Sequence, residues 1–172
     1  MSQSQYKANP VSIKDLRTYA FLLRQAMNME NTLQIDIIRV LEHNMISAFG
    51  ESFELEVVET HTMPDYALYL PESNKMLIRE DVYLAAASMN ARHRFTIAHE
   101  IGHLLLHRDV KLARSDGKRK IYEDPEWQAN VFAAEFLAPA HLIGEMSAAE
   151  ISLAFGISKQ AATNRYNSIK EK

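Results

Sequence analysis

Two histidines four residues apart constrain this chain more than any other feature. The run from His99 to His103 reads His-Glu-Ile-Gly-His, so Glu100 directly follows the first histidine. Apolar residues lie on every side of the surrounding segment, which predicts a buried helix from about Asn90 to His107. Positions four apart share one helix face, so both imidazoles can reach one tetrahedral metal ion at about 2.0–2.1 Å. Burying these groups without partners would be costly, so we predict a metal site. Glu100 is placed to accept a proton from water.

The ligands of such a site must be imidazole and carboxylate groups, because the chain contains no cysteine. A catalytic zinc site needs a third protein ligand. The extended motif HExxHxxGxxH is absent, since Leu106 stands at its glycine position and Asp109 at its third histidine position. A helix predicted to begin at Pro125, after Asp124 as its cap, carries two candidate carboxylates. These are Glu126 and Glu135.

Several residues near the motif have roles that the sequence leaves open. His107 lies one turn beyond His103, and we interpret it as a cationic residue favoured by the helix C-terminus. Tyr122, His107 and Arg92 are candidates for stabilising a tetrahedral oxyanion. The charged stretch from Lys111 to Lys120 could contact a substrate, although a solvated surface loop is the favoured interpretation.

The hydrophobic periodicity predicts one α+β domain over residues 1–172. After a polar, flexible start, helices are expected from Ser12 to about Met29 and from Asn31 or Thr32 to Gly50. Alternating residues 53–57 predict a strand, and residues 67–78 predict strand, turn and strand. A loop over 108–123 and a helix to Leu137 follow. The expected parts are N-terminal helices (1–50), a core with a small twisted sheet and two site helices (51–140), and a helix-turn-helix-like tail around Gly156 (141–172).

Composition excludes some environments and partners. No N-terminal signal peptide is visible, and no apolar run approaches the about 18 residues that span a bilayer, so we expect a cytoplasmic protein without a membrane partner. The formal net charge of −3 gives no general attraction to nucleic acid.

Two separate motifs resemble those of the ImmA/IrrE family of metallopeptidases. The first is Arg94 to His107, RFTIAHEIGHLLLH, and the second is Glu126 to Pro139, EWQANVFAAEFLAP. The resemblance extends over roughly residues 60–170. It implies a zincin-like core with a gluzincin-type Zn²⁺ site, in which His99, His103 and Glu126 are ligands and Glu100 is the catalyst.

Helix geometry also favours Glu126 over Glu135. Nine steps of about 100° place the two carboxylates on opposite faces, so only one can face the metal. The Glu126 face carries small residues that would allow close helix packing, whereas the Glu135 face, shared with Gln128, suits solvent or a charge partner. Glu126 also lies in the first turn, where a carboxylate is favoured. Asn130, one turn further on, could support the ligands by hydrogen bonding.

The resemblance implies amide hydrolysis in a transcriptional repressor of phage, mobile-element or stress genes. Many similar proteins carry an N-terminal DNA-binding domain, which residues 1–60 do not resemble, so the repressor partner is expected to be a separate chain. An alternative is a DNA- or repressor-binding module with a non-catalytic zinc site, in which Lys159, Arg165 and Lys170 contact phosphates. A helical hairpin packed on the core is the preferred interpretation of that tail. A toxin–antitoxin component is a third possibility.

Overall fold

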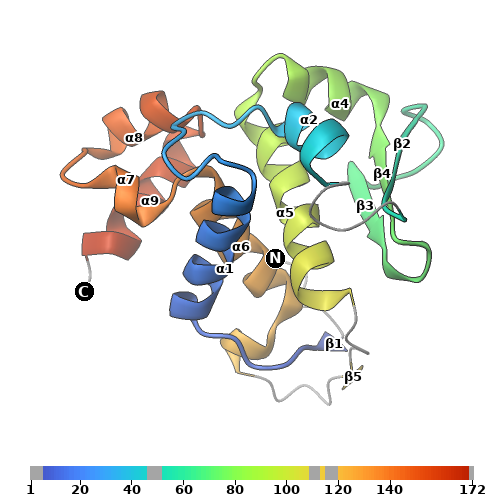
Figure 1. Ribbon diagram of the computed structural model, residues 1–172, viewed down its shortest axis with the longest axis horizontal. Coiled ribbons are helices and arrows are strands. Elements are labelled where there is room, and N and C mark those ends of the chain that lie inside the picture. The colour runs from blue at the N-terminus through green and yellow to red at the C-terminus, as the bar shows by residue number, and fades with distance from the viewer. Residues whose placement is uncertain (1–5, 46–51, 109–112, 115–119, 171–172) are drawn as a thin grey trace.

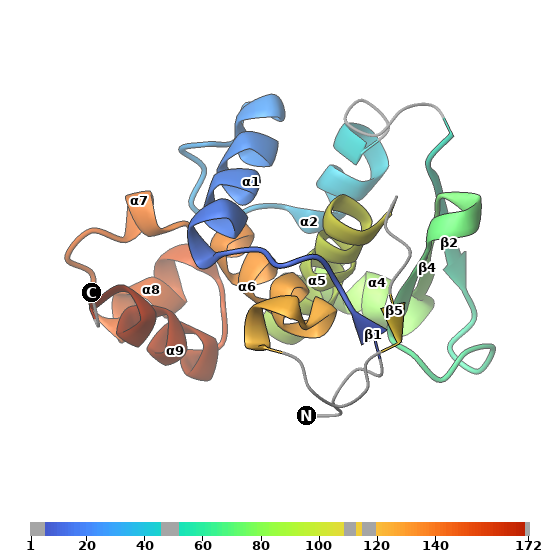
Figure 2. The same cartoon turned by 90° about the horizontal axis from the view of Figure 1, so that it is seen from below.

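The computed structural model describes residues 6–45, 52–108, 113–114 and 120–170. A three-stranded sheet lies at one end of the molecule, and three helices between residues 140 and 170 lie at the other (Figure 1). The two helices expected to carry the site run between these ends, and Figure 2 shows the same arrangement from below. The predicted α+β class is therefore confirmed.

The sheet has the order β2 (Glu54–Val58), β4 (Lys75–Arg79), β3 (Ala67–Leu70). Strand β3 pairs antiparallel with β4 through the turn at Pro71–Ser73, which confirms the predicted strand, turn and strand. Strand β2 is parallel to β4, a pairing that the sequence does not predict. Strand β3 is therefore an edge strand of this sheet, and it contacts the helix that carries the histidine motif.

The two site helices are those that the sequence predicts. Helix α5 (Ala91–His107) begins at Asn90, whose side chain accepts hydrogen bonds from two backbone amides of the first turn. Helix α6 (Pro125–Leu137) begins at Asp124, whose carboxylate accepts the amide hydrogen of Glu126, with proline at the first helical position. The two helices pack closely at Gly102. A Cβ on this residue would lie only 3.1 Å from the Cα of Ala129.

The N-terminal helices differ from the prediction in their bounds. Helix α1 (Ile13–Ala26) has the predicted cap at Ser12 but ends earlier than expected. The expected start of the next helix at Asn31 or Thr32 is wrong, because the Thr32 carbonyl accepts a hydrogen bond from Arg24 and this segment stays non-helical. Asp36 caps helix α2 (Ile37–Arg39) instead, and a π-helical turn, Val40–Asn44, continues it. The predicted end at Gly50 lies outside the described residues, as does most of the charged stretch from Lys111 to Lys120.

Five short elements are absent from the prediction. They are helix α4 (Glu80–Ala87), helix α7 (Ala140–Ile143), the 3₁₀ turn Ile121–Glu123, and strands β1 (Tyr6–Lys7) and β5 (Ala113–Arg114), which pair with each other. Among the described residues, the expected flexible start is therefore wrong at Tyr6–Lys7, and the loop expected over 108–123 is wrong at Ala113–Arg114 and Ile121–Glu123. The N-terminal segment runs across α6 and α5 toward β5 (Figure 2). Backbone hydrogen bonds from Ala8 to Glu123 and from Val11 to Tyr122 hold it there.

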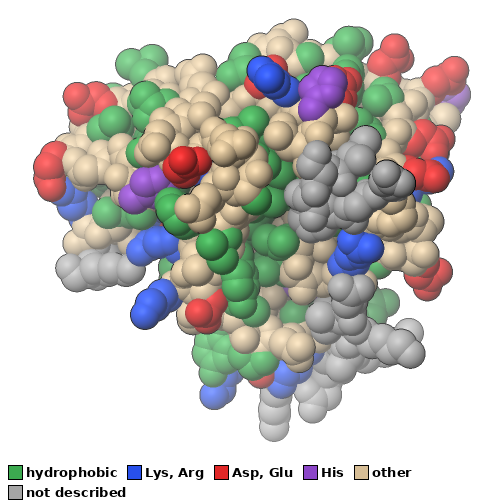
Figure 3. Space-filling view, in the orientation of Figure 1, with side chains coloured by type: hydrophobic (Ala, Val, Ile, Leu, Met, Phe, Trp, Pro, Cys, Tyr) green, Lys and Arg blue, Asp and Glu red, His purple; other side chains and the backbone are tan. Residues whose placement is uncertain are grey.

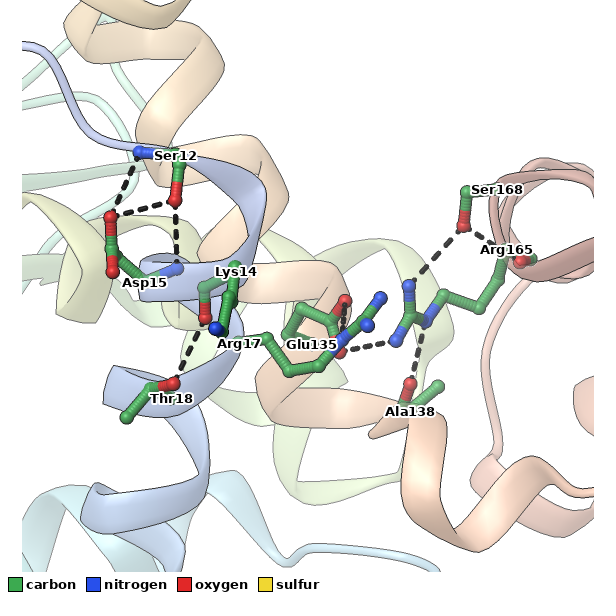
Figure 4. Close-up of polar contacts among 9 residues, drawn as sticks. All are labelled: Ser12, Lys14, Asp15, Arg17, Thr18, Glu135, Ala138, Arg165 and Ser168. Atoms are coloured by element: carbon green, nitrogen blue, oxygen red, sulfur yellow. Dashed lines mark hydrogen bonds and ion pairs between the residues drawn. The ribbon is translucent and has the colours of Figure 1, made fainter. Parts of the chain in front are cut away.

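The C-terminal tail contains helices α8 (Ala148–Phe155) and α9 (Lys159–Lys170), joined around Gly156 as predicted. Arg94 of α5 is buried and donates hydrogen bonds to the carbonyls of Phe155 and Gly156. Arg165 of α9 is also buried and pairs with Glu135 of α6 (Figure 4). The tail is thus fixed to the helices that carry the histidine motif and its partners.

Candidate metal centre

Three side chains from α5 and α6 converge on one point. The Nε2 atoms of His99 and His103 lie 3.0 Å apart. The Glu126 Oε2 atom lies 3.3 Å from His99 Nε2, and the Glu126 Oε1 atom lies 3.4 Å from His103 Nε2. Two ligand atoms of a tetrahedral zinc ion lie about 3.3–3.6 Å apart, given ligand distances of about 2.0–2.2 Å. The two distances to Glu126 match this spacing, and the distance between the two histidine nitrogens is about 0.3 Å shorter. With this small difference, the positions and the donor types suit such an ion.

The approach of α6 to α5 explains how a short carboxylate reaches the histidines. The backbone of Ala129 lies against Gly102, at the point where any larger residue would push the helices apart. Ala129 and Ala133 are fully buried in this interface, as the predicted face of small residues requires. Glu126, in the first turn of α6, consequently lies opposite His99 and His103.

The charges of the three groups depend on one another. Hydrogen bonds from His103 and His99 hold the pKa of the Glu126 carboxyl well below its usual range. Burial opposes a charge on His99, but the Glu126 hydrogen bond and the nearby carboxylates outweigh it and raise the pKa of His99. The cluster therefore places an ionised carboxylate opposite two imidazole nitrogens that face each other. This donor set suits a divalent cation.

Glu100 lies beside the cluster without belonging to it, since the described residues within ligand distance of one another are His99, His103 and Glu126. The backbone N–H of Tyr69, in the edge strand β3, donates a 3.0 Å hydrogen bond to the Glu100 carboxylate. Burial raises the pKa of Glu100, which makes its carboxylate a better proton acceptor. The sequence predicts the position of Glu100 but gives no sign of its contact with Tyr69.

Asn130 occupies the supporting position that the sequence predicts. Its Oδ1 atom lies 3.0 Å from His99 Nδ1, the nitrogen that faces away from the cluster. An acceptor at this position favours a proton on Nδ1 and leaves the Nε2 lone pair for a metal.

His107 requires a correction. It is 5% exposed, and burial lowers its pKa to about 4, so the interpretation as a cation at the helix end is wrong. Its Nδ1 atom lies 3.0 Å from His103 Nδ1, and its Nε2 atom lies 2.9 Å from Gln128 Oε1. Both nitrogens have partners, which removes His107 as a candidate for oxyanion stabilisation. Of the other candidates, Arg92 contacts the Tyr66 hydroxyl. A role in oxyanion stabilisation stays a prediction for Arg92 and Tyr122.

The remaining carboxylate of α6, Glu135, points away from the cluster. It is buried between Arg17 of α1 and Arg165 of α9 (Figure 4). Of the two surroundings expected for it, the charge partner is confirmed and solvent is wrong. The same contacts argue against the alternative in which Arg165 binds phosphate, because Glu135 and the Ala138 carbonyl bind its guanidinium.

Comparison with solved structures shows a similar fold in a Mycobacterium tuberculosis transcriptional regulator. The TM-score is 0.62 at 16% sequence identity, and the match covers 89% of this chain and 55% of that one. The chain thus spans about half the length of this structural relative, and the likeness shows the fold alone. Comparison with curated proteins gives no match. None of the described helices combines the length and apolar character needed to cross a membrane.

A sequence family settles the assignment that the two motifs suggest. The family Peptidase_M78, described as the IrrE N-terminal-like domain, matches residues 50–167. The match covers well over half of the chain and includes the three-stranded sheet, both site helices and most of the tail. The chain therefore belongs to the Peptidase_M78 family of IrrE N-terminal-like domains.

Proposed function

We propose that the protein is a zinc metallopeptidase with a zincin-like core, in which His99, His103 and Glu126 hold the ion and Glu100 is the general base. The observation that carries this proposal is the convergence of the three ligand groups with a partly buried carboxylate beside them. Membership in a peptidase family supports the same reaction class. The chemistry of the ligands, two imidazoles and one carboxylate, suits Zn²⁺.

The reaction would be hydrolysis of a peptide bond. When bound, a zinc ion polarises the scissile carbonyl and makes a water molecule acidic enough to attack near neutral pH. Glu100 accepts the proton of that water and passes it to the departing amine. The Tyr69 amide holds the Glu100 carboxylate in place during both transfers. Glu100 shares helix α5 with His99 and His103, whereas the third proposed ligand, Glu126, approaches from α6.

We further propose that the substrate is a helix-turn-helix transcriptional repressor and that cleavage occurs in the cytoplasm. This proposal rests on the resemblance to ImmA/IrrE metallopeptidases. The structural relative named as a transcriptional regulator is consistent with a regulatory setting but is a different protein.

DNA binding by the tail has less support. Arg165 is buried against Glu135, and Lys170 pairs with Glu145. On the face of the molecule in Figure 3, Lys and Arg side chains are scattered among acidic ones. A phosphate-binding surface would instead gather several free cations.

The experiment that tests the proposed function is a comparison of new protein N-termini in a cell lysate. The zinc-loaded protein and its Glu100→Gln variant are incubated separately, and new amino groups are labelled and identified. We expect cleavage sites in one or a few repressors with the first protein only. Identical sites with both proteins would contradict the role of Glu100. Rapid cleavage of casein or of random peptides would contradict the narrow substrate choice.

A further inference from the structure

The two histidines of the cluster have different supports behind them. His99 contacts Asn130 directly. His103 begins a longer chain of hydrogen bonds through His107 to Gln128, over distances of 3.0 and 2.9 Å. The Gln128 Nε2 atom then lies 2.7 Å from the Asn9 carbonyl and 2.8 Å from the Tyr122 carbonyl. This series of hydrogen bonds thus ends at the N-terminal segment and the turn before α6.

The outer end of this chain fixes the direction of every hydrogen bond in it. Two carbonyl oxygens surround one end of the Gln128 amide, so that end is the NH₂ group and the other is the oxygen. The Gln128 oxygen can only accept, and the proton between it and His107 is therefore on His107 Nε2. A neutral His107 then offers its Nδ1 lone pair to His103.

The inner end of the chain gives the same answer independently. An imidazole that binds a metal through Nε2 carries its proton on Nδ1. With a metal on His103 Nε2, the atom that faces His99 and Glu126, the proton of that ring is on Nδ1 and points toward His107. Donor and acceptor therefore match at each step from His103 to the two carbonyls.

We infer that His107 and Gln128 are positioning residues that orient His103 as the Nδ1–H tautomer and so leave its Nε2 lone pair for the metal. This inference rests on the proposed metal site. His107 is not a ligand, because its Nδ1 atom faces the far nitrogen of His103 and the described ligand group does not include it. Gln128 is 1% exposed, which protects the hydrogen bonds from competing water.

The first arm of the test measures zinc affinity by competition with a chelator. His107→Phe and Gln128→Met keep the buried volume but remove the hydrogen bonds, and we expect zinc affinity to fall about 10–100-fold in each. His107→Asn places an oxygen near the former Nδ1 position, and we expect it to retain most of the affinity. His93→Phe is the matched control. It changes the same residue type on the same helix, about 21 Å along the axis from His107, and should bind zinc like the unmodified protein.

The second arm observes the hydrogen bonds directly by NMR with ¹⁵N-labelled histidine. We expect His107 to be protonated on Nε2 alone in the metal-free protein. In the zinc-bound protein we expect a coupling between the Nδ1 atoms of His103 and His107 across their hydrogen bond. Unfolding temperatures of the metal-free variants separate a loss of fold from a loss of positioning.

The outcomes distinguish this inference from the proposed function. Unchanged zinc affinity in folded His107→Phe and Gln128→Met would overturn the inference alone. So would a His107 ring that is unprotonated on Nε2. An unmodified protein that binds no zinc would overturn the proposed function and this inference with it.

Discussion

At the scale of single residues, Glu100 and the three proposed ligands differ in what their removal should do. Glu100 is held by the Tyr69 amide and is not part of the ligand group. We therefore expect Glu100→Gln to bind one zinc per chain while hydrolysis slows at least about 100-fold, the usual contribution of a general base. Zinc content by elemental analysis and cleavage of an identified substrate measure the two effects. Equal metal loss in Glu100→Gln and His99→Ala would show that the roles are misassigned.

The two carboxylates of α6 give a second residue-scale prediction. Glu126→Ala should lower zinc affinity by more than the about 10–100-fold expected for a residue behind the ligands. Glu135→Ala should leave zinc affinity unchanged but lower the free energy of unfolding by about 3–5 kcal/mol, because Arg165 would remain buried without its partner.

Chelator competition and denaturant unfolding separate these effects. Loss of zinc affinity only in Glu135→Ala would contradict the assignment. A large stability loss in metal-free Glu126→Ala, with zinc binding intact in the folded fraction, would also contradict it.

The candidate site was predictable to the extent that its residues share a helix face. His99, Glu100 and His103 follow from one spacing, and Glu126 and Asn130 follow from helix geometry together with the resemblance. Gln128 and the Tyr69 amide were not predictable, because their contacts depend on which elements pack together and not on any local pattern. His107 has the right spacing, but spacing alone does not distinguish a buried neutral imidazole from a cation at a helix end.

At the scale of elements, the contact between Gly102 and Ala129 sets the separation of α5 and α6. A Cβ at Gly102 would lie 3.1 Å from the Ala129 Cα and 3.2 Å from its carbonyl oxygen, and backbone atoms cannot easily move away. We expect Gly102→Ala to cost about 1–3 kcal/mol of stability, which outweighs the better helix propensity of alanine. It should also weaken zinc binding, because Glu126 moves with α6.

The measurements are a denaturant titration and the same chelator competition. Ser152→Ala, a small-residue change on α8 away from the metal cluster, serves as a control for zinc binding. A Gly102→Ala protein that is more stable than the original and binds zinc equally well would show that the helices are not in tight contact.

Long elements with local signals were predicted well, and short elements were not. Helices α5 and α6 combine a side-chain cap with a sustained apolar pattern. Helix α4 has neither, since Arg79 provides no capping hydrogen bond and the helix has eight residues. Strands β1 and β5 have two residues each, too few to show a period. Their pairing depends on contacts between distant parts of the chain, as does the parallel pairing of β2 with β4.

At the scale of the whole molecule, buried arginines connect parts that the sequence leaves separate. Arg94 joins α5 to the turn between α8 and α9, and it also donates to the Ile35 carbonyl. Arg165 joins α9 to α6 (Figure 4). These contacts explain why a tail with a helix-turn-helix pattern can pack as part of the core. The expectation of one domain over residues 1–172 remains a prediction. Sequence alone does not distinguish such an arginine from an exposed cation.

The most direct test of the proposed zinc site is anomalous X-ray scattering at the zinc absorption edge. Crystals of the Glu100→Gln variant are suitable, because that variant should keep the metal while it leaves a substrate uncut. The account predicts one strong peak between His99, His103 and Glu126, within about 2.0–2.2 Å of one ligand atom from each. No peak at that position, or a peak between the Nδ1 atoms of His103 and His107, would contradict it.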